Sequence, residues 1–311
     1  MKPFVGLNAE AFAAYSQEKW SSNVHNLARM RVKDALTALA ERVQEDAGPD
    51  LAGLERVASD EMPTITNQKK VDAQWVVWFR DASARTALAS FLEKLKLDQT
   101  ALLNTAPQDK HAALALVLRQ KELWVGLHLG PGASVDRRNL AAKLAKGWER
   151  ERALELVQAL PAGSAVGLGD EYRPGAELSL GALDELGAAL ADSHASLHLG
   201  WGIGNEEAQS LGVGLAERAA AFVRALAPLY RWLAWTRDND HIEAGKQLQE
   251  EKREKRRQAV SYNAGDKVRI VSGLFSGKIG VVQEIDTKAQ VKVRVGKMSV
   301  VVAGTDLTPV S

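Results

Sequence analysis

The sequence predicts three parts: an N-terminal domain of the α/β or α+β class over residues 1–242, a charged helical tether over 243–260, and a small all-β domain over 261–311. Three observations predict them. The C-terminal part alternates apolar and charged side chains at a period of two, which is typical of half-buried strands. The segment before it consists mostly of mixed charges and has hardly any apolar side chains. The long N-terminal part mixes helical and strand periodicities, as layered folds do.

The alternation is clearest in the runs 266–271 and 291–295, where valine or isoleucine occupies every second position and points to one side of a strand. The residues between them are basic, so four positive side chains are expected on the outside: Lys267, Arg269, Lys292 and Arg294. Gly273, Gly277 and Gly280 stand where the runs break. Glycine supplies the positive φ or the close backbone approach that tight corners need. Together these features predict a small β-barrel.

The same residues resemble the KOW module, an SH3-like barrel found at the end of the transcription factor NusG and in several ribosomal proteins. The matching positions are Gly265-Asp266, Val268, Gly273, Gly277-Lys278, Gly280, Val282, Glu284-Ile285-Asp286 and the strand 291–295. The resemblance implies docking onto RNA, a ribosome or RNA polymerase, because such modules mostly serve as docking pieces on these machines. It covers only the C-terminal domain, and the upstream residues do not follow the N-terminal domain of NusG.

Two further contacts are predicted. Phe275 stands between Gly273 and Gly277, where the valines already fill the interior. One interpretation makes its ring, with Lys278 beside it, a docking or base-stacking contact, and the other folds the ring back as a lid on the barrel. The tether holds a basic cluster that is either an RNA contact or a solvated helix face: Lys252, Arg253, Lys255, Arg256 and Arg257.

Charge is unevenly distributed along the chain. The net charge is +1, but residues 243–311 hold 13 Lys and Arg against 8 Asp and Glu. Residues 1–242 hold the other 27 Lys and Arg and the other 31 Asp and Glu. Contact with a polyanion is therefore expected at the C-terminal end. The chain has no cysteine, which excludes disulfides and thiolate metal sites. It also has no apolar run of membrane-spanning length, so a cytoplasmic location without membrane contact is expected.

The N-terminal domain is expected to contain helices and strands. Helices are predicted over 8–47, where Asn8 is the expected N-cap and Gly48-Pro49 ends the helical spacing. Three apolar runs predict strands: 74–79, 112–118 and 123–129. A helix through Leu95 is expected after the first strand. Eight tryptophans predict a bulky core with aromatic edges or, as the alternative, an aromatic cleft for a ligand or a base.

A short repeat lies within this domain. Leu127-His128-Leu129-Gly130-Pro131-Gly132 is echoed by Leu197-His198-Leu199-Gly200-Trp201-Gly202, and an apolar helix is expected after each. Two similar strand-loop-helix units are therefore predicted, from duplication or from reuse of a turn. His128 and His198 are equivalent in them, and they are expected either to face each other across a cleft or to be ordinary turn residues.

No catalytic residue, cofactor or metal site is predicted. The sequence has no nucleophile elbow, HExxH or kinase motif set. The glycine loops lack a phosphate-binding pattern, and the helices after them carry their own expected side-chain caps: Ser134, Asp136, Asn205, Glu206 and Glu207. Asp238-Asn239-Asp240-His241 has a metal-like composition, but it is expected to end a helix.

Three functions stay open. The favoured one is a non-enzymatic factor that docks through the barrel onto RNA, a ribosome or the transcription machinery. The second is an enzyme whose N-terminal domain the barrel tethers to nucleic acid. The third is an adaptor that binds protein alone. In the favoured function residues 1–242 are expected to contact a second partner, which the sequence does not identify.

Overall fold

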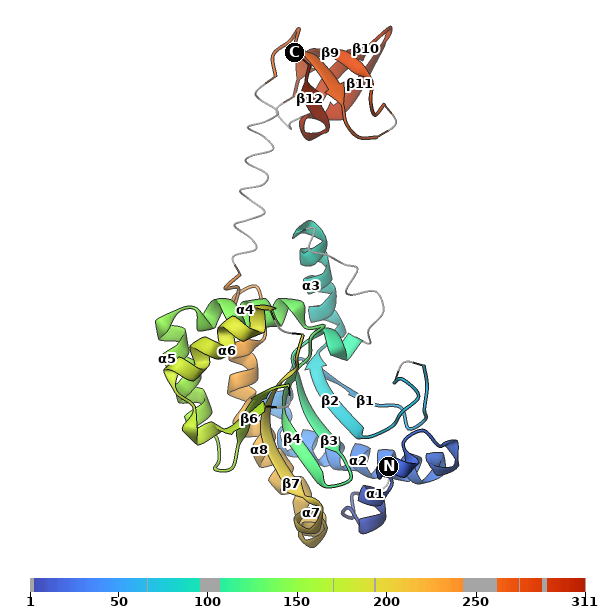
Figure 1. Ribbon diagram of the computed structural model, residues 1–311, viewed down its shortest axis with the longest axis vertical. Coiled ribbons are helices and arrows are strands. Elements are labelled where there is room, and N and C mark those ends of the chain that lie inside the picture. The colour runs from blue at the N-terminus through green and yellow to red at the C-terminus, as the bar shows by residue number, and fades with distance from the viewer. Residues whose placement is uncertain are drawn as a thin grey trace. The chain divides into compact units, whose positions relative to one another are not determined.

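A computed structural model describes residues 3–65, 67–95, 107–169, 171–192, 194–242, 262–273, 275–286 and 290–310. The chain divides into two compact units, Met1–Ile242 and Glu243–Ser311, which Figure 1 colours along the sequence. The tether predicted over 243–260 lies outside the described residues. None of the described helices combines the length and the apolar character needed to cross a membrane.

The N-terminal unit is built on a seven-stranded sheet with the strand order β1-β2-β3-β4-β7-β5-β6. Every pair of neighbouring strands runs antiparallel, which is the layout of α+β folds. The strands are β1 (Leu54–Ala58), β2 (Gln74–Arg80), β3 (Ala113–Leu118), β4 (Glu122–Leu129), β5 (Ala165–Leu168), β6 (Glu171–Pro174) and β7 (Leu197–Gly204). The helices are α1 (Ala9–Ala13), α2 (Asn26–Asp46), α3 (Ala82–Leu95), α4 (Ser134–Leu144), α5 (Gly147–Gln158), α6 (Leu180–Asp192), α7 (Asn205–Leu211) and α8 (Leu215–Leu233).

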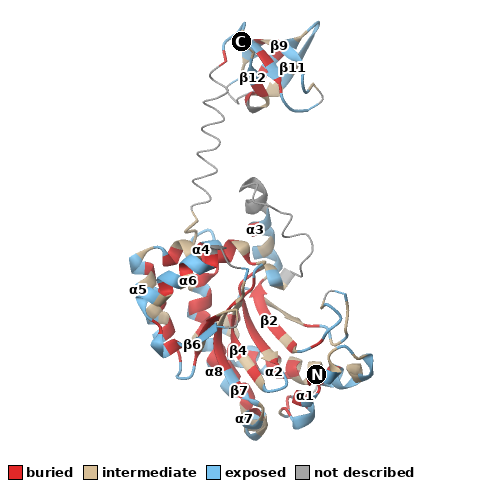
Figure 2. Ribbon diagram, in the orientation of Figure 1, coloured by how far each residue is buried: buried red, intermediate tan, exposed pale blue. Residues whose placement is uncertain are grey.

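Strand alternation gives this sheet two different faces. Helices α2 and α8 pack on one of them, the covered face, and they lie behind β2, β3 and β4 in the view of Figure 1. Side chains that point toward these helices form the main core, including Trp78, Leu114, Leu116, Leu127 and Leu199, and Figure 2 shows buried residues concentrated along the strands. Burial of apolar area, at about 25 cal/mol per Å², is the main force that stabilises this layer. The other side of the strands, the open face, carries a smaller cluster of Val77, Phe79, Ala113 and Ala115.

The predicted elements of the N-terminal domain are largely confirmed. The three expected strands are β2, β3 and β4, and α3 follows β2. The Asn8 side chain accepts a hydrogen bond from the Ala11 N–H at 3.0 Å, as an N-cap does. Helix α2 ends at Asp46, just before Gly48-Pro49. Its face toward the sheet repeats at helical spacing and is fully buried at Leu36, Leu39 and Val43.

The prediction of two strand-loop-helix units is wrong. A loop separates β4 from α4, but β7 runs on to Gly204, and α7 begins at Asn205 directly after it. Gly200-Trp201-Gly202 therefore lies inside a strand. The physical reason is that β7 pairs with β4 along its whole length and that Trp201 points to the covered face, where its ring stacks on Phe222 with ring centroids 4.2 Å apart.

The C-terminal unit is all-β. Its five strands form one antiparallel sheet with the order β11-β10-β9-β8-β12. They are β8 (Lys267–Ile270), β9 (Ile279–Ile285), β10 (Gln290–Val295), β11 (Met298–Ala303) and β12 (Leu307–Pro309). Its core consists of Tyr262, Val268, Ile270, Val282, Val291, Val293 and Leu307. The one polar atom in this core is satisfied, because the Tyr262 hydroxyl donates to the Leu307 carbonyl at 2.7 Å.

The three predicted corner glycines have the expected roles. Gly273 (φ 78°) and Gly277 (φ 83°) adopt left-handed backbone conformations. Gly280 serves close approach instead. A Cβ atom there would lie 2.5 Å from Val293 Cγ1 and 2.7 Å from the Arg294 carbonyl oxygen, so only glycine fits between β9 and β10.

Candidate functional site

Four predicted basic side chains share the outer face of the C-terminal sheet, and we call them the basic face: Lys267, Arg269, Lys292 and Arg294. Lys267 is in register with Val281, and Val281 is in register with Arg294, so the two cations flank one residue across three neighbouring strands. Residues in register point to the same side of a sheet, and strands lie about 4.8 Å apart. Lys267 and Arg294 are therefore roughly 10 Å apart along the backbone layer. Arg269 lies in the next row on one side of this pair, and Lys292, in register with the exposed Glu284, lies across a β-bulge on the other side.

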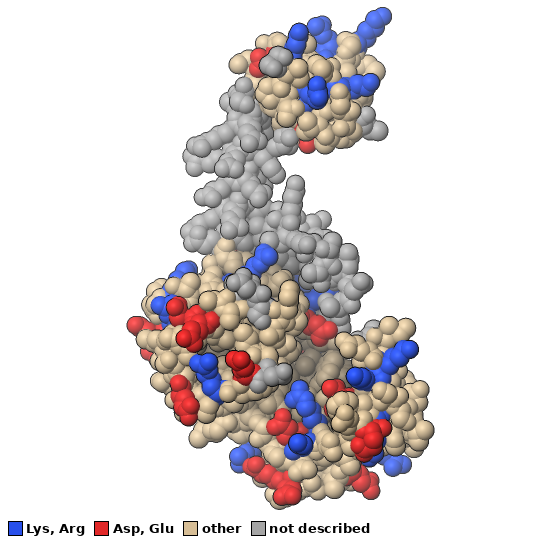
Figure 3. All heavy atoms as spheres, in the orientation of Figure 1, with Lys and Arg blue, Asp and Glu red and all other residues tan. Residues whose placement is uncertain are grey.

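The cations of the basic face are free to bind an external anion. All four side chains are exposed, and none forms an ion pair within the part of the chain that the structure describes. Exposed apolar residues lie beside them: Ile279 (48% exposed) is in register with Arg269, and Val301 (65% exposed) with Lys292. Figure 3 shows Lys and Arg side chains at several places on the visible side of this unit. Cations interleaved with exposed apolar side chains suit a partner with charged and apolar parts.

Phe275 is placed differently from the docking interpretation of the sequence. Its ring is half-buried and packs against the core of the C-terminal unit, which matches the alternative role of a lid. Lys278 is exposed beside it, and its N–H donates to the Phe275 carbonyl at 3.1 Å. The second predicted contact, with Lys252, Arg253, Lys255, Arg256 and Arg257, lies outside the described residues.

The open face of the N-terminal sheet holds a second candidate site. Strand register arranges its side chains in three rows: Phe79, Ala113, His128 and His198; then Val77, Ala115, Gly126 and Gly200; then Trp75, Val117, Trp124 and Gly202. The middle row is made of small residues and the outer rows carry large ones, so the face is a trough. A hollow of about 240 Å³ lies on it, which we call the open-face hollow, and Figure 3 shows the unit hollowed over these strands.

His128 and His198 meet at one end of this hollow. They are directly in register on β4 and β7, and their Nδ1 atoms are 3.3 Å apart. The two histidines that the sequence repeat made equivalent therefore lie side by side on adjacent strands. Burial lowers the pKa of His128 to about 4, with smaller contributions from His198 and Arg119. Burial, followed by Arg119, also lowers the pKa of His198, so both rings are neutral at neutral pH.

On the open face, aromatic rings pack over glycines. The ring of Trp124 lies over Gly126, where a Cβ atom would come within 2.1 Å of Trp124 Cζ2, and Tyr172 covers Gly167 in the same way. Trp124 also meets His198 edge to face, with ring centroids 5.6 Å apart. The sequence analysis did not predict the trough or the part played by Tyr172. The signal for the trough was the spacing of Trp124, Gly126 and His128 at every second residue of one strand.

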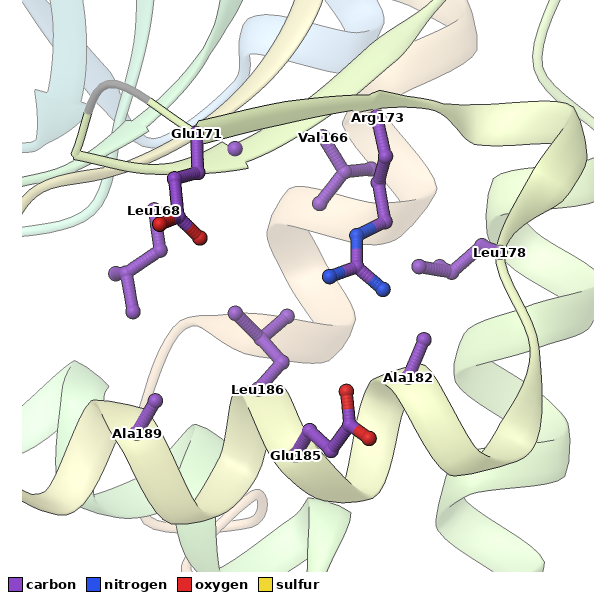
Figure 4. Close-up of a pocket in the computed structure, with 10 residues that line it drawn as sticks. Val166, Leu168, Glu171, Arg173, Leu178, Ala182, Glu185, Leu186 and Ala189 are labelled. Carbon is purple, nitrogen blue, oxygen red and sulfur yellow. The ribbon is translucent and has the colours of Figure 1, made fainter.

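A second hollow, of about 200 Å³, lies between the β5–β6 hairpin and α6. Figure 4 shows Arg173 and Glu185 pointing toward each other across it, and Glu171 beside Leu168 on the hairpin. All three charged side chains are exposed. Water therefore solvates them, and this hollow is best described as an apolar surface groove with an ordinary charged rim.

The acidic side chain expected to cap α4 has a different role. Asp136 forms a buried ion pair with Arg80 at 2.6 Å, and it accepts the N–H groups of Ala112 and Trp235, each at 2.8 Å. Neither α4 nor α7 has a side-chain cap, so that expectation is wrong. The Arg80 charge draws Asp136 inward, away from the N-terminus of its own helix.

The segment 238–241 ends a helix, as predicted. The Asn239 side chain donates to the carbonyls of Trp232 and Ala234, both at 2.8 Å, and Asp240 accepts from the Trp235 indole at 3.1 Å. Among the described residues no group of three or more His, Asp or Glu side chains lies close enough to hold a metal ion. Compared with known proteins, the chain matches no protein-family model and no curated protein.

The buried histidines make the N-terminal unit sensitive to acid. Burial lowers the pKa of His111 as well as that of His128 from the ordinary 6.5 to about 4. Between these pH values the unfolded chain binds more protons than the folded one, so stability is full above about 6.5 and is lost as the pH falls toward 4. We expect a loss on the order of 3 kcal/mol for each of the two histidines.

Urea unfolding at pH 7.5, 5.5 and 4.5 checks this. His128→Asn is expected to flatten the decline in stability on acidification, whereas His194→Gln, at an exposed position, serves as the matched control. Equal slopes for the wild type and His128→Asn would contradict the assignment.

Proposed function

We propose that the C-terminal unit is a KOW-type, SH3-like barrel that docks the chain onto RNA, carried by a ribosome or by the transcription machinery, and that the protein is a non-enzymatic factor. The basic face carries this proposal. Lys267 and Arg294 flank one residue in register, and Arg269 and Lys292 extend the same surface. None of the four forms an ion pair with a described acid, although Lys292 is in register with the exposed Glu284.

Phosphate binding follows from this arrangement. Each phosphate that a Lys or Arg contacts releases condensed counterions, which drives association and makes it salt-dependent. Four exposed cations on a rigid sheet give a modest, sequence-independent affinity, as a docking piece within a larger machine requires. Ile279 and Val301, exposed in the same rows, supply apolar contact to sugars or bases.

The position of Phe275 favours RNA over protein alone as the partner. A surface built only for protein docking would be expected to concentrate aromatic anchors, and the one candidate anchor, Phe275, packs half-buried against the core. If the chain does not bind RNA in the experiment below, the function that remains is an adaptor that binds protein alone.

Binding of the full chain to a short single-stranded RNA, measured over a series of salt concentrations, tests the proposal. Three or four phosphate contacts at the single-strand value predict a slope of log affinity against log salt of roughly −2 to −3. An affinity that salt does not change, or no binding at the lowest salt, would refute RNA docking.

A further inference from the structure

The open-face hollow is not needed for docking through the basic face, and its chemistry points to a ligand of its own. It combines two stacking surfaces, a hydrogen-bonding pair and an apolar floor within about 240 Å³. That volume lies just below the usual range of roughly 300–1,000 Å³ for pockets that hold drug-sized ligands. It therefore suits one compact ring system.

The histidine pair supplies the hydrogen-bonding edge. Two neutral rings whose Nδ1 atoms are 3.3 Å apart share one proton, so one Nδ1–H donates and the other Nδ1 is bare. A neutral imidazole carries one N–H, so the donor ring has a bare Nε2 and the acceptor ring has its proton on Nε2. Among the described residues neither Nε2 has a protein partner, and neither is a fully buried orphan. His128 and His198 therefore offer one acceptor and one donor at the same end of the hollow, on the sides of the two rings that face away from their Nδ1 contact.

Indole rings supply the stacking surfaces. Trp75 on β2 and Trp124 on β4 are in register through Val117 on β3, and the Trp124 ring lies over Gly126, where it covers part of the floor. Their backbones are roughly 10 Å apart, two strand spacings. Both indoles are half-buried and line the hollow. A flat ring that enters along the floor contacts aromatic surface and reaches the histidine pair with its edge.

The charged side chains around the hollow disfavour a bound phosphate. Arg119 is the one cation among the described side chains that line it, and Asp72 and Asp109 are two carboxylates. The histidines are neutral, so a dianion would meet more negative charge than positive. A metal ion is equally unsupported, because no group of three ligands forms among the described residues.

We propose that the open-face hollow binds a nucleobase. A base is neutral and flat and carries both hydrogen-bond donors and acceptors around its ring, so it can meet the free Nε2 groups of His128 and His198, one of which accepts and one of which donates. Its faces stack on the indoles of Trp75 and Trp124. A free nucleoside and an unpaired base of a single strand share this chemistry.

The indole N–H signals of the full chain, followed by ¹H–¹⁵N NMR, test the proposal. Titration with adenosine, cytidine, guanosine and uridine tests the free nucleoside, and titration with short single-stranded RNA tests the unpaired base, with an abasic oligonucleotide as the control for the backbone. We expect the signals of Trp75 and Trp124 to shift with nucleosides or with RNA and not with the abasic strand. No shift with any base-containing probe would overturn the proposal.

Two substitutions locate the binding. Trp75→Leu removes one stacking surface, and His198→Asn removes the paired tautomers; each is expected to weaken binding about tenfold or more. Melting curves verify that both variants are folded, and unchanged binding in both would overturn the proposal. The Lys267→Glu/Arg294→Glu background keeps this test separate from RNA docking, because nucleoside binding is expected to persist in it.

Discussion

Asp136→Leu is expected to destabilise the N-terminal unit by about 3–5 kcal/mol, since it leaves a buried Arg80 charge without its partner. The side chains of Arg80 and Asp136 are only 7% and 0% exposed. The substitution also removes the acceptor of the Ala112 and Trp235 N–H groups, and each buried orphan donor adds to the loss. Urea unfolding followed by circular dichroism measures the effect.

Replacing both Arg80 and Asp136 separates the cost of the unpaired charge from the cost of the unpaired N–H groups. Buried ion pairs are often replaceable by apolar side chains at little cost, but Arg80→Met/Asp136→Leu still leaves the N–H groups of Ala112 and Trp235 unpaired. The double variant is therefore expected to recover stability only in part. Glu155→Ala breaks the exposed Arg152–Glu155 pair and is expected to change stability by less than about 1 kcal/mol. A loss for Asp136→Leu as small as that of this control would contradict the account.

Gly200→Ala is expected to destabilise the same unit by about 3 kcal/mol or more, because the new Cβ meets backbone atoms of the neighbouring strand. It would lie 2.3 Å from the Val125 carbonyl oxygen and 2.5 Å from Gly126 Cα. Backbone cannot rotate away as a side chain does, so β4 and β7 would have to separate at the centre of the sheet.

Gly202→Ala is the matched control on the same strand and the same face. Its Cβ would come within 2.3 Å of a Glu122 carboxylate oxygen, the far end of a flexible side chain that is free to swing aside. Thermal melts of the two variants are expected to show a large drop for Gly200→Ala and a small one for Gly202→Ala. Equal drops would mean that the close approach of β4 and β7 is not what requires glycine at position 200.

The parts of this fold that local pattern determines were predictable from the sequence. Alternation at a period of two gave β8 and β10 and placed Lys267 and Arg294 outward, because side-chain direction in a strand depends only on position. Gly280 was predictable as a corner or close-approach position because it stands where the apolar alternation breaks. That Val293 would be the residue packed against it was not predictable.

The parts that depend on register between distant segments were not predictable. The repeat marked His128 and His198 as equivalent, but their contact joins residues 70 positions apart and depends on the pairing of β4 with β7. The hydrogen bond from the Trp235 N–H to Asp136 joins residues 99 positions apart. From the local sequence alone, Asp136 is expected to cap its own helix. The trough likewise exists only once four strands align the small residues of its middle row.

The most direct test of the docking proposal is the RNA affinity of the full chain after charge reversal on the basic face. Lys267→Glu/Arg294→Glu is compared with Lys121→Glu/Arg138→Glu, which makes the same charge change at exposed positions of the N-terminal unit. The first pair is expected to weaken binding of a short single-stranded RNA at low salt at least about tenfold and to reduce the salt slope by roughly 0.7 per lost contact, without changing the melting curve. The second pair is expected to have little effect. Equal weakening by both pairs, or none by the first, would contradict docking through the basic face.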